Sequence, residues 1–123
     1  VAIVGGTIVN DVIRRELVGG SVVVQFDLST RVVRDGREQS VSVPVAWHDP
    51  LPSADAFLLP GHGVVVLGRI ERRFFRSGGL TQSRTELVVE RCVPVRRTKS
   101  VRSLLAAAAA VLESAPEAGR DSQ

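Results

Sequence analysis

The clearest hydrophobic pattern in the chain is the segment at residues 61–75, which reads GHGVVVLGRIERRFF. Its β-branched side chains favour a strand, and successive side chains of a strand point to opposite faces. The face expected in the core carries Val64, Val66, Gly68 and Ile70. The face expected to be exposed to solvent carries Arg69, Glu71, Arg73 and Phe75. A glycine in the middle of a strand is typical of a bulge or of a sharp bend in a small barrel.

Alternation of apolar and polar residues predicts four further strands. They are expected at residues 1–9, 21–33, 39–48 and 83–94, with residues 10–20 as an irregular turn and residues 76–82 as a loop. Asp35-Gly36 predicts a hairpin turn between the second and third of these strands. Ser53 is an expected N-cap for a short helix between Pro50 and Pro60.

The end of the chain changes character. Residues 98–115 are rich in alanine, the best helix former, and carry a narrow apolar stripe at helical spacing. They predict a C-terminal helix that docks on the barrel or on a partner subunit. Residues 116–123 are expected to be a disordered tail.

Three strands, a short helix and two strands are the layout of an OB-fold. We therefore predict an all-β fold: a five-stranded OB-fold barrel over residues 1–97, with a short helix between strands 3 and 4 and a C-terminal α-helix after it.

Charge and composition narrow the function. The net charge is only +3, but residues 69–76 contain four arginines and one acid. A basic strand face that ends in an aromatic residue is typical of proteins that bind single-stranded nucleic acid. The alternative is an ordinary amphipathic strand with a solvated charged face.

Other chemistry is not indicated. His48 and Asp49 are adjacent in a strand and point apart, and the sequence shows no catalytic triad, phosphate-binding glycine loop or metal-ligand cluster. We expect no enzyme activity, no cofactor and no small-molecule substrate.

The single cysteine, Cys92, excludes an internal disulfide and fits a reducing compartment. No membrane-spanning run or signal peptide is evident, so a cytoplasmic location is expected.

Four segments together resemble the bacterial single-stranded DNA-binding protein (SSB) family. They are residues 26–30 (FDLST), 45–47 (VAW), 61–70 (GHGVVVLGRI) and 85–88 (TELV). They occur in the family's order and with similar spacing over residues 1–95. No one segment is specific; their joint order is what carries the resemblance.

The resemblance implies binding of single-stranded DNA by base stacking and by phosphate contacts. Trp47 and Phe75 match two of the family's stacking aromatics. Val41 stands where the family has a tryptophan, and Arg34 lies near the place of another, where its guanidinium plane could stack in its stead. The expected nucleic-acid-binding residues are Trp47, Phe75, Arg69, Arg72, Arg73 and Arg34. Phe74, beside Phe75, is expected in the core.

The sequence supports two positions for the Trp47 side chain, one on the binding surface and one in the core. Trp47 alternates in phase with Val41, Val43 and Val45, so the same pattern would equally bury it in the core.

The resemblance also implies a homo-oligomer, typically a tetramer, that acts in DNA replication, repair and recombination. Family members usually end in an acidic stretch with a hydrophobic tip that recruits partner proteins, and residues 117–123 lack such a tip. This predicts a diverged paralogue.

Two other functions remain open. One is an OB-fold that serves as a protein-protein interaction module with weak or no DNA binding, and the other is a structural oligomeric subunit without a ligand. Exposure of Trp47 and Phe75, and a continuous groove of arginines, would favour DNA binding.

Overall fold

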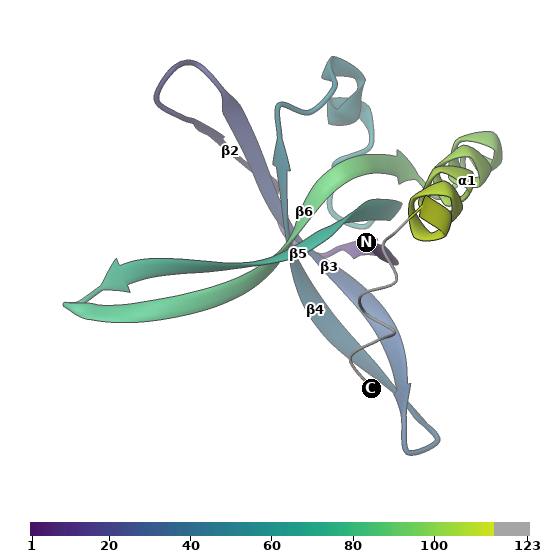
Figure 1. Ribbon diagram of the computed structural model, residues 1–123, viewed down its shortest axis with the longest axis horizontal. Helices are drawn as coiled ribbons and strands as arrows, with labels where there is room; N and C mark the ends of the chain where they lie inside the picture. The colour runs from purple at the N-terminus through teal and green to yellow at the C-terminus, as the bar shows by residue number, and fades with distance from the viewer. Residues whose placement is uncertain (115–123) are drawn as a thin grey trace.

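The computed structural model describes residues 1–114, which form six strands, one 3-10 turn and one α-helix. Figure 1 shows their arrangement. In chain order the elements are β1 (Ala2–Ile8), β2 (Ile13–Glu16), β3 (Val22–Arg34), β4 (Arg37–His48), η1 (Pro52–Ala56), β5 (Gly63–Ser77), β6 (Leu80–Pro94) and α1 (Thr98–Ser114).

Five of the strands close into a barrel. The hydrogen-bonded order is β1-β5-β6-β4-β3, and a short pairing of β1 with β3 closes the ring. All pairs are antiparallel except β4 with β6, where Val45 lies opposite Leu87 in a parallel pair. This closed mixed barrel confirms the predicted five-stranded OB-fold with a C-terminal helix.

Two details of the predicted layout were wrong. The short helix between β4 and β5 is only the 3-10 turn η1; Leu51 is its N-cap, and no side chain caps it. Residues 13–16, which were expected in an irregular turn, form β2 and pair with the outer side of β3. All four residues of β2 are exposed, so the strand had no hydrophobic pattern to reveal it.

The barrel interior is filled by the alternating apolar positions of its strands. Val64 and Val66 of β5 are fully buried there with Leu28 and Leu87. Gly68 marks a register shift between β5 and β6, as the sequence indicated. A Cβ at this position would lie 2.1 Å from the carbonyl oxygen of Val88, so the two backbones approach more closely than any other residue permits.

Helix α1 covers the outside of β5. Leu104 and Ala108 pack on Val65 and Leu67, and all four are buried. The first half of β5 is therefore buried on both faces, which explains its uninterrupted apolar run. Docking on the barrel was one of the two positions expected for this helix.

Besides the short β2–β3 hairpin, two longer hairpins project from the barrel as two-stranded ribbons (Figure 1). One joins β3 to β4 through Asp35 and Gly36, whose φ angles of 52° and 73° confirm the predicted hairpin turn. The other joins β5 to β6 through Gly78 and Gly79 alone, because the two strands extend through most of the loop expected at residues 76–82.

We call the distal part of the β5–β6 hairpin, residues 69–88, the arm. Leu87 and Val88 at its base are still buried in the barrel, but the β5 side of the arm leaves the core, and two core assignments fail there for that reason. The side chain of Ile70 is 56% exposed and that of Phe74 is 68% exposed.

Within residues 1–114, no helix is both long and apolar enough to cross a membrane. Residues 115–123, including the predicted disordered tail and the end that lacks an acidic tip, lie outside the described residues.

Candidate nucleic-acid interface

One face of the arm carries charged side chains from both strands and the aromatic ring of Phe75 from β5. Arg73 and Phe75 of β5 lie opposite Arg84 and Gln82 of β6, and Glu71 lies opposite Glu86. Paired residues of an antiparallel ribbon share a face. The predicted exposed set Arg69, Glu71, Arg73 and Phe75 is thus continued by residues of β6.

This face, together with Phe74 from the next position on β5, lines a hollow of about 460 Å³ between the arm and the neighbouring strands. Strands β2 and β3 contribute Arg15 and Gln25 from across the hollow. The lining residues are Arg15, Gln25, Arg73, Phe74, Phe75, Arg84 and Glu86.

Two further hollows adjoin this one because they share lining residues with it. The hollow of about 100 Å³ beside β2 shares Arg15, Gln25 and Arg84, and the hollow of about 330 Å³ beside His48 shares Arg73 and also contains Arg69. We call the three together the arm groove. It runs along the arm and onto the barrel.

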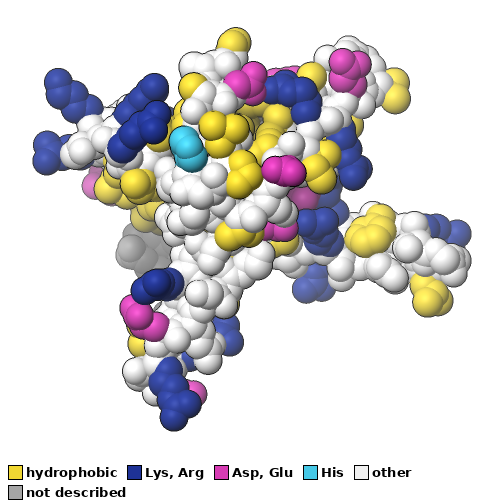
Figure 2. Space-filling model, turned by 180° about the vertical axis from the view of Figure 1, so that it is seen from behind, with side chains coloured by type: hydrophobic (Ala, Val, Ile, Leu, Met, Phe, Trp, Pro, Cys, Tyr) yellow, Lys and Arg dark blue, Asp and Glu magenta, His cyan; other side chains and the backbone are white. Residues whose placement is uncertain are grey.

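Four arginines and three acids line the arm groove. They are Arg15, Arg69, Arg73 and Arg84, and Asp27, Glu71 and Glu86. Figure 2 shows cationic side chains beside hydrophobic ones on the projecting arm, at the right of that view.

Several of these arginines already have acidic neighbours. An Nη atom of Arg84 lies 3.8 Å from Asp27, and Nη1 of Arg73 lies 3.2 Å from Glu86. Arg69 pairs with Glu71 and lies 3.7 Å from Glu90. The arginine side chains are 52–58% exposed. A pair between two exposed side chains, such as Arg69 with Glu71 or Glu90, contributes about 0–1 kcal/mol, so Arg69 can exchange an acid for a phosphate at little cost. The pair of Arg73 with Glu86 differs, because Glu86 is buried and loses its charged neighbour when Arg73 turns away.

The structure brings three of the sequence-predicted residues together. Arg69, Arg73 and Phe75 all line the arm groove, and the side chain of Phe75 is 44% exposed. Arg72 is exposed, but it alternates with Arg73 along β5 and lies on the other face of the ribbon.

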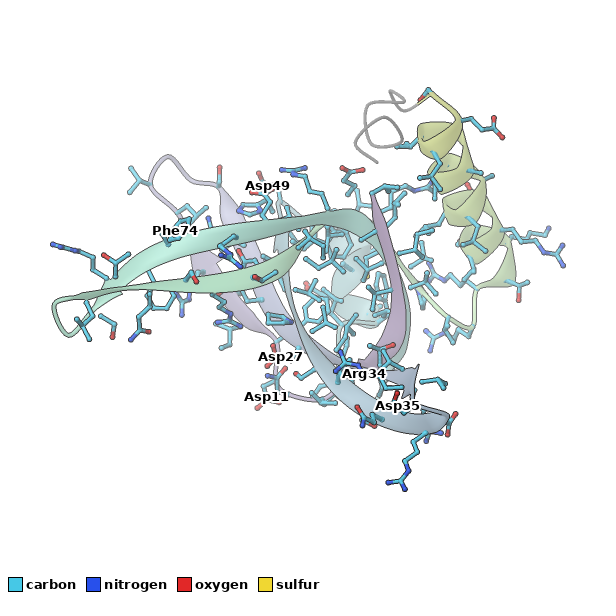
Figure 3. The ribbon with its side chains drawn as sticks, turned by 60° about the horizontal axis from the view of Figure 1, so that its bottom comes forward. Asp11, Asp27, Arg34, Asp35, Asp49 and Phe74 are labelled. Atoms are coloured by element: carbon cyan, nitrogen blue, oxygen red, sulfur yellow. The ribbon has the colours of Figure 1, made fainter. Side chains whose placement is uncertain are left out.

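Arg34 is on the other hairpin. It sits next to the turn between β3 and β4 and lies opposite Arg37. Figure 3 shows Arg34 and Asp35 at the tip of that hairpin, well apart from Phe74 on the arm. The structure therefore does not bring Arg34 into the arm groove.

Trp47 lies in the barrel core. Its side chain is 6% exposed and packs in the main hydrophobic cluster. Its ring centroid is 6.4 Å from that of Phe57, at an interplanar angle of 38°. Of the two interpretations left open by the sequence, burial favours the core residue, because a buried ring presents no free face to a base.

The groove residues that the sequence analysis missed include Phe74, Arg15 and Arg84. Phe74 was assigned to the core because alternation was continued beyond the end of the barrel. Arg15 lies on the unpredicted strand β2. Arg84 lies just within the predicted strand at residues 83–94, and its alternation with Glu86 could have placed it on a common face.

The thiol of Cys92 does not line the arm groove. Cys92 is 6% exposed in the barrel core, and burial raises the pKa of its thiol to about 12. The thiol is therefore unreactive at neutral pH. Among residues 1–114, no group of three or more His, Cys, Asp or Glu side chains is placed to hold a metal ion.

Comparisons with known proteins agree with this fold. No protein-family model matches the chain, and no curated protein sequence matches it. Among solved structures it is similar to a Plasmodium falciparum SSB in complex with single-stranded DNA, with a TM-score of 0.68 and 18% sequence identity. The similarity covers 76% of this chain and 92% of the Plasmodium chain. At this identity the comparison establishes the fold: the chain has an SSB-like OB-fold.

Proposed function

We propose that this protein binds single-stranded DNA in the arm groove, without catalysis. The observation that carries the proposal is the pair of exposed phenylalanines, Phe74 and Phe75, in a hollow lined by three arginines on an OB-fold. Adjacent exposed apolar side chains often mark a binding site, and base stacking on aromatic side chains is sequence-tolerant because every base has a π-face.

The groove arginines supply the second part of the mechanism. Arg15, Arg73 and Arg84 approach one hollow from β2, β5 and β6, so a strand lying in it would meet cations from both sides. Guanidinium groups bind phosphate oxygens bidentately and also stack on bases. Arg72 and Arg34 lie outside the groove and are proposed as flanking phosphate contacts for a longer strand.

The similarity to an SSB described as a complex with single-stranded DNA supports this proposal. By the same resemblance we propose a homo-oligomer, tetrameric as is usual in that family, with a role in DNA replication, repair or recombination. Trp47 is not part of the proposed mechanism.

A protein-protein interaction module is the second candidate. The exposed side of α1 favours it, since Leu105, Val111 and Leu112 are 46%, 44% and 59% exposed on a helix rich in alanine. Such a face can dock a partner helix or strand. In that case the arm groove would carry no ligand.

Direct binding of fluorescein-labelled oligo(dT) separates the two functions. We expect fluorescence anisotropy to rise on titration with the protein at low salt, and the affinity to fall as salt is raised. Leu112→Ser on α1 is the matched control and should bind oligo(dT) as the wild type does. If the wild type gives no anisotropy change and no mobility shift at low salt, the DNA-binding proposal fails and the interaction module remains.

A further inference from the structure

The arm groove contains one group that phosphate binding does not explain. Glu86 is a buried acid on β6, with 3% of its surface exposed. Its Oε1 is buried and has no hydrogen-bond partner among the residues that the structure describes. Nearly all buried polar atoms in proteins have such a partner, because an unsatisfied one is costly.

Arg73 does not remove this deficit. Its Nη1 lies 3.2 Å from Glu86 Oε1, which is close enough for an ion pair, but the contact lacks the geometry of a hydrogen bond. The Arg73 side chain is 54% exposed and can turn toward solvent or a phosphate. The carboxylate would then present a free acceptor at the wall of the hollow.

Position and charge restrict what this acceptor can bind. Glu86 shares its ribbon face with Arg84 and lines the same hollow as Phe74 and Phe75. A carboxylate repels phosphate, so it does not serve the tracking of a DNA backbone. It accepts hydrogen bonds from N–H donors, and in a single strand such donors are on the free edges of the bases.

The four bases differ in what they offer a carboxylate. Guanine presents two adjacent donors, N1–H and the N2 amino group, which match the two oxygens of a carboxylate. Cytosine and adenine present one amino group beside an acceptor. Thymine presents one N–H between two carbonyl oxygens, which the carboxylate repels.

We propose that Glu86 makes the arm groove selective for guanine at one base position. This inference rests on the proposed DNA binding. The strand would be held by stacking and by arginines at every position, and Glu86 would read the base edge at one of them. Binding of guanine would also supply the hydrogen bonds that the buried Oε1 lacks.

The test compares oligonucleotides of equal length in competition with labelled oligo(dT). One alternates dT with dG, and the other alternates dT with deoxyinosine, which differs from dG only by the missing N2 amino group. We expect the wild type to bind the dT/dG strand at least about fivefold more tightly than the dT/dI strand, the lower end for a bidentate base contact.

Two variants assign the effect to Glu86. Glu86→Gln keeps the size and removes the charge, so it should bring the ratio of the two affinities close to one while oligo(dT) still binds. Glu90→Gln removes one negative charge outside the groove and should keep the wild-type ratio. The comparison of the two strands on the wild type needs no variant to fold.

The outcomes separate the inference from the function on which it rests. If the wild type binds oligo(dT) but binds the dT/dG and dT/dI strands equally, guanine selection is wrong and DNA binding stands. If Glu86→Gln keeps the preference, another residue reads the base and the assignment to Glu86 is wrong. If no strand binds, the proposed function fails together with the inference.

Discussion

Replacement of Phe75 by leucine tests the stacking mechanism most directly. Leucine keeps an apolar side chain at the position but has no π-face for a base. Stacking on an aromatic side chain is worth about 1–3 kcal/mol per base, so Phe75→Leu should weaken oligo(dT) binding by about five- to 150-fold. Phe75→Trp retains the π-face and should bind at least as tightly as the wild type.

A loss of binding in Phe75→Leu should not come from a loss of stability. The Phe75 side chain is 44% exposed and lies on the arm, away from the barrel core. The exchange should therefore change the free energy of unfolding by less than about 1.5 kcal/mol. Urea midpoints of the wild type and both variants check this.

The assay is fluorescence anisotropy of labelled oligo(dT) at several salt concentrations. Because leucine removes no charge, the slope of log K against log salt should be the same in Phe75→Leu as in the wild type. A Phe75→Leu protein with a wild-type urea midpoint and wild-type affinity would refute stacking on this residue. A changed salt slope would show that the variant had altered phosphate contacts instead.

Three further predictions concern charge, packing and pH. Arg84→Ala should reduce the steepness of the salt slope by about 0.7, the value for one phosphate contact on a single strand, whereas Arg102→Ala on α1 should leave the slope unchanged. Gly68→Ala should lower the free energy of unfolding by about 3 kcal/mol or more, because its Cβ would meet a carbonyl oxygen at 2.1 Å, whereas Gly5→Ala has nothing within 4 Å and should be nearly neutral in urea unfolding. Burial raises the pKa of Cys92 from 9.0 to about 12, so its contribution to stability is complete below pH 9 and is lost as pH rises toward 12. The chain has no tyrosine and one lysine, so the urea midpoint of the wild type should fall over this range more than that of Cys92→Ala; equal losses would contradict the assignment.

The barrel could be predicted from the sequence because its strands place apolar side chains inward and polar side chains outward at alternate positions. A strand with one face in a core and one in solvent alternates, and β3 does so where buried Val24, Phe26 and Leu28 are separated by less buried polar residues. Gly68 also predicted the irregularity in β5, because a glycine in the middle of a strand usually marks a bulge or a bend. The Asp35-Gly36 turn was determined by backbone conformation at two adjacent residues.

Alternation failed where the surroundings of a strand change along its length. Ile70 and Phe74 continue the inward phase of β5, but the barrel has ended and both are exposed. The pattern of one strand contains no information on where its neighbours stop. Strand β2 was missed for the complementary reason: a fully exposed strand is held by backbone hydrogen bonds to β3 and leaves no apolar pattern.

The candidate site could be predicted only in the part that lies on one strand. Arg69, Arg73 and Phe75 are near in sequence and alternate together, so their common face was evident. Arg15 and Arg84 reach the same groove from β2 and β6, and their meeting depends on the pairing of strands far apart in the chain. Whether Trp47 faced the core or a ligand could not be decided from phase alone, because both surfaces accept an aromatic ring.

The close approach at Gly68 divides two continuous strands into parts of unequal local stability. On the barrel side, β5 and β6 are held by the core and by α1. Beyond the pairing of Leu87 and Val88 with β4 they form a two-stranded ribbon, and such a ribbon alone is marginally stable in water. Opening of the arm should therefore require much less free energy than global unfolding. A ligand in the arm groove would act mainly on the equilibrium between the open and closed arm. Part of its binding free energy would keep the arm closed, while the stability of the barrel would not change.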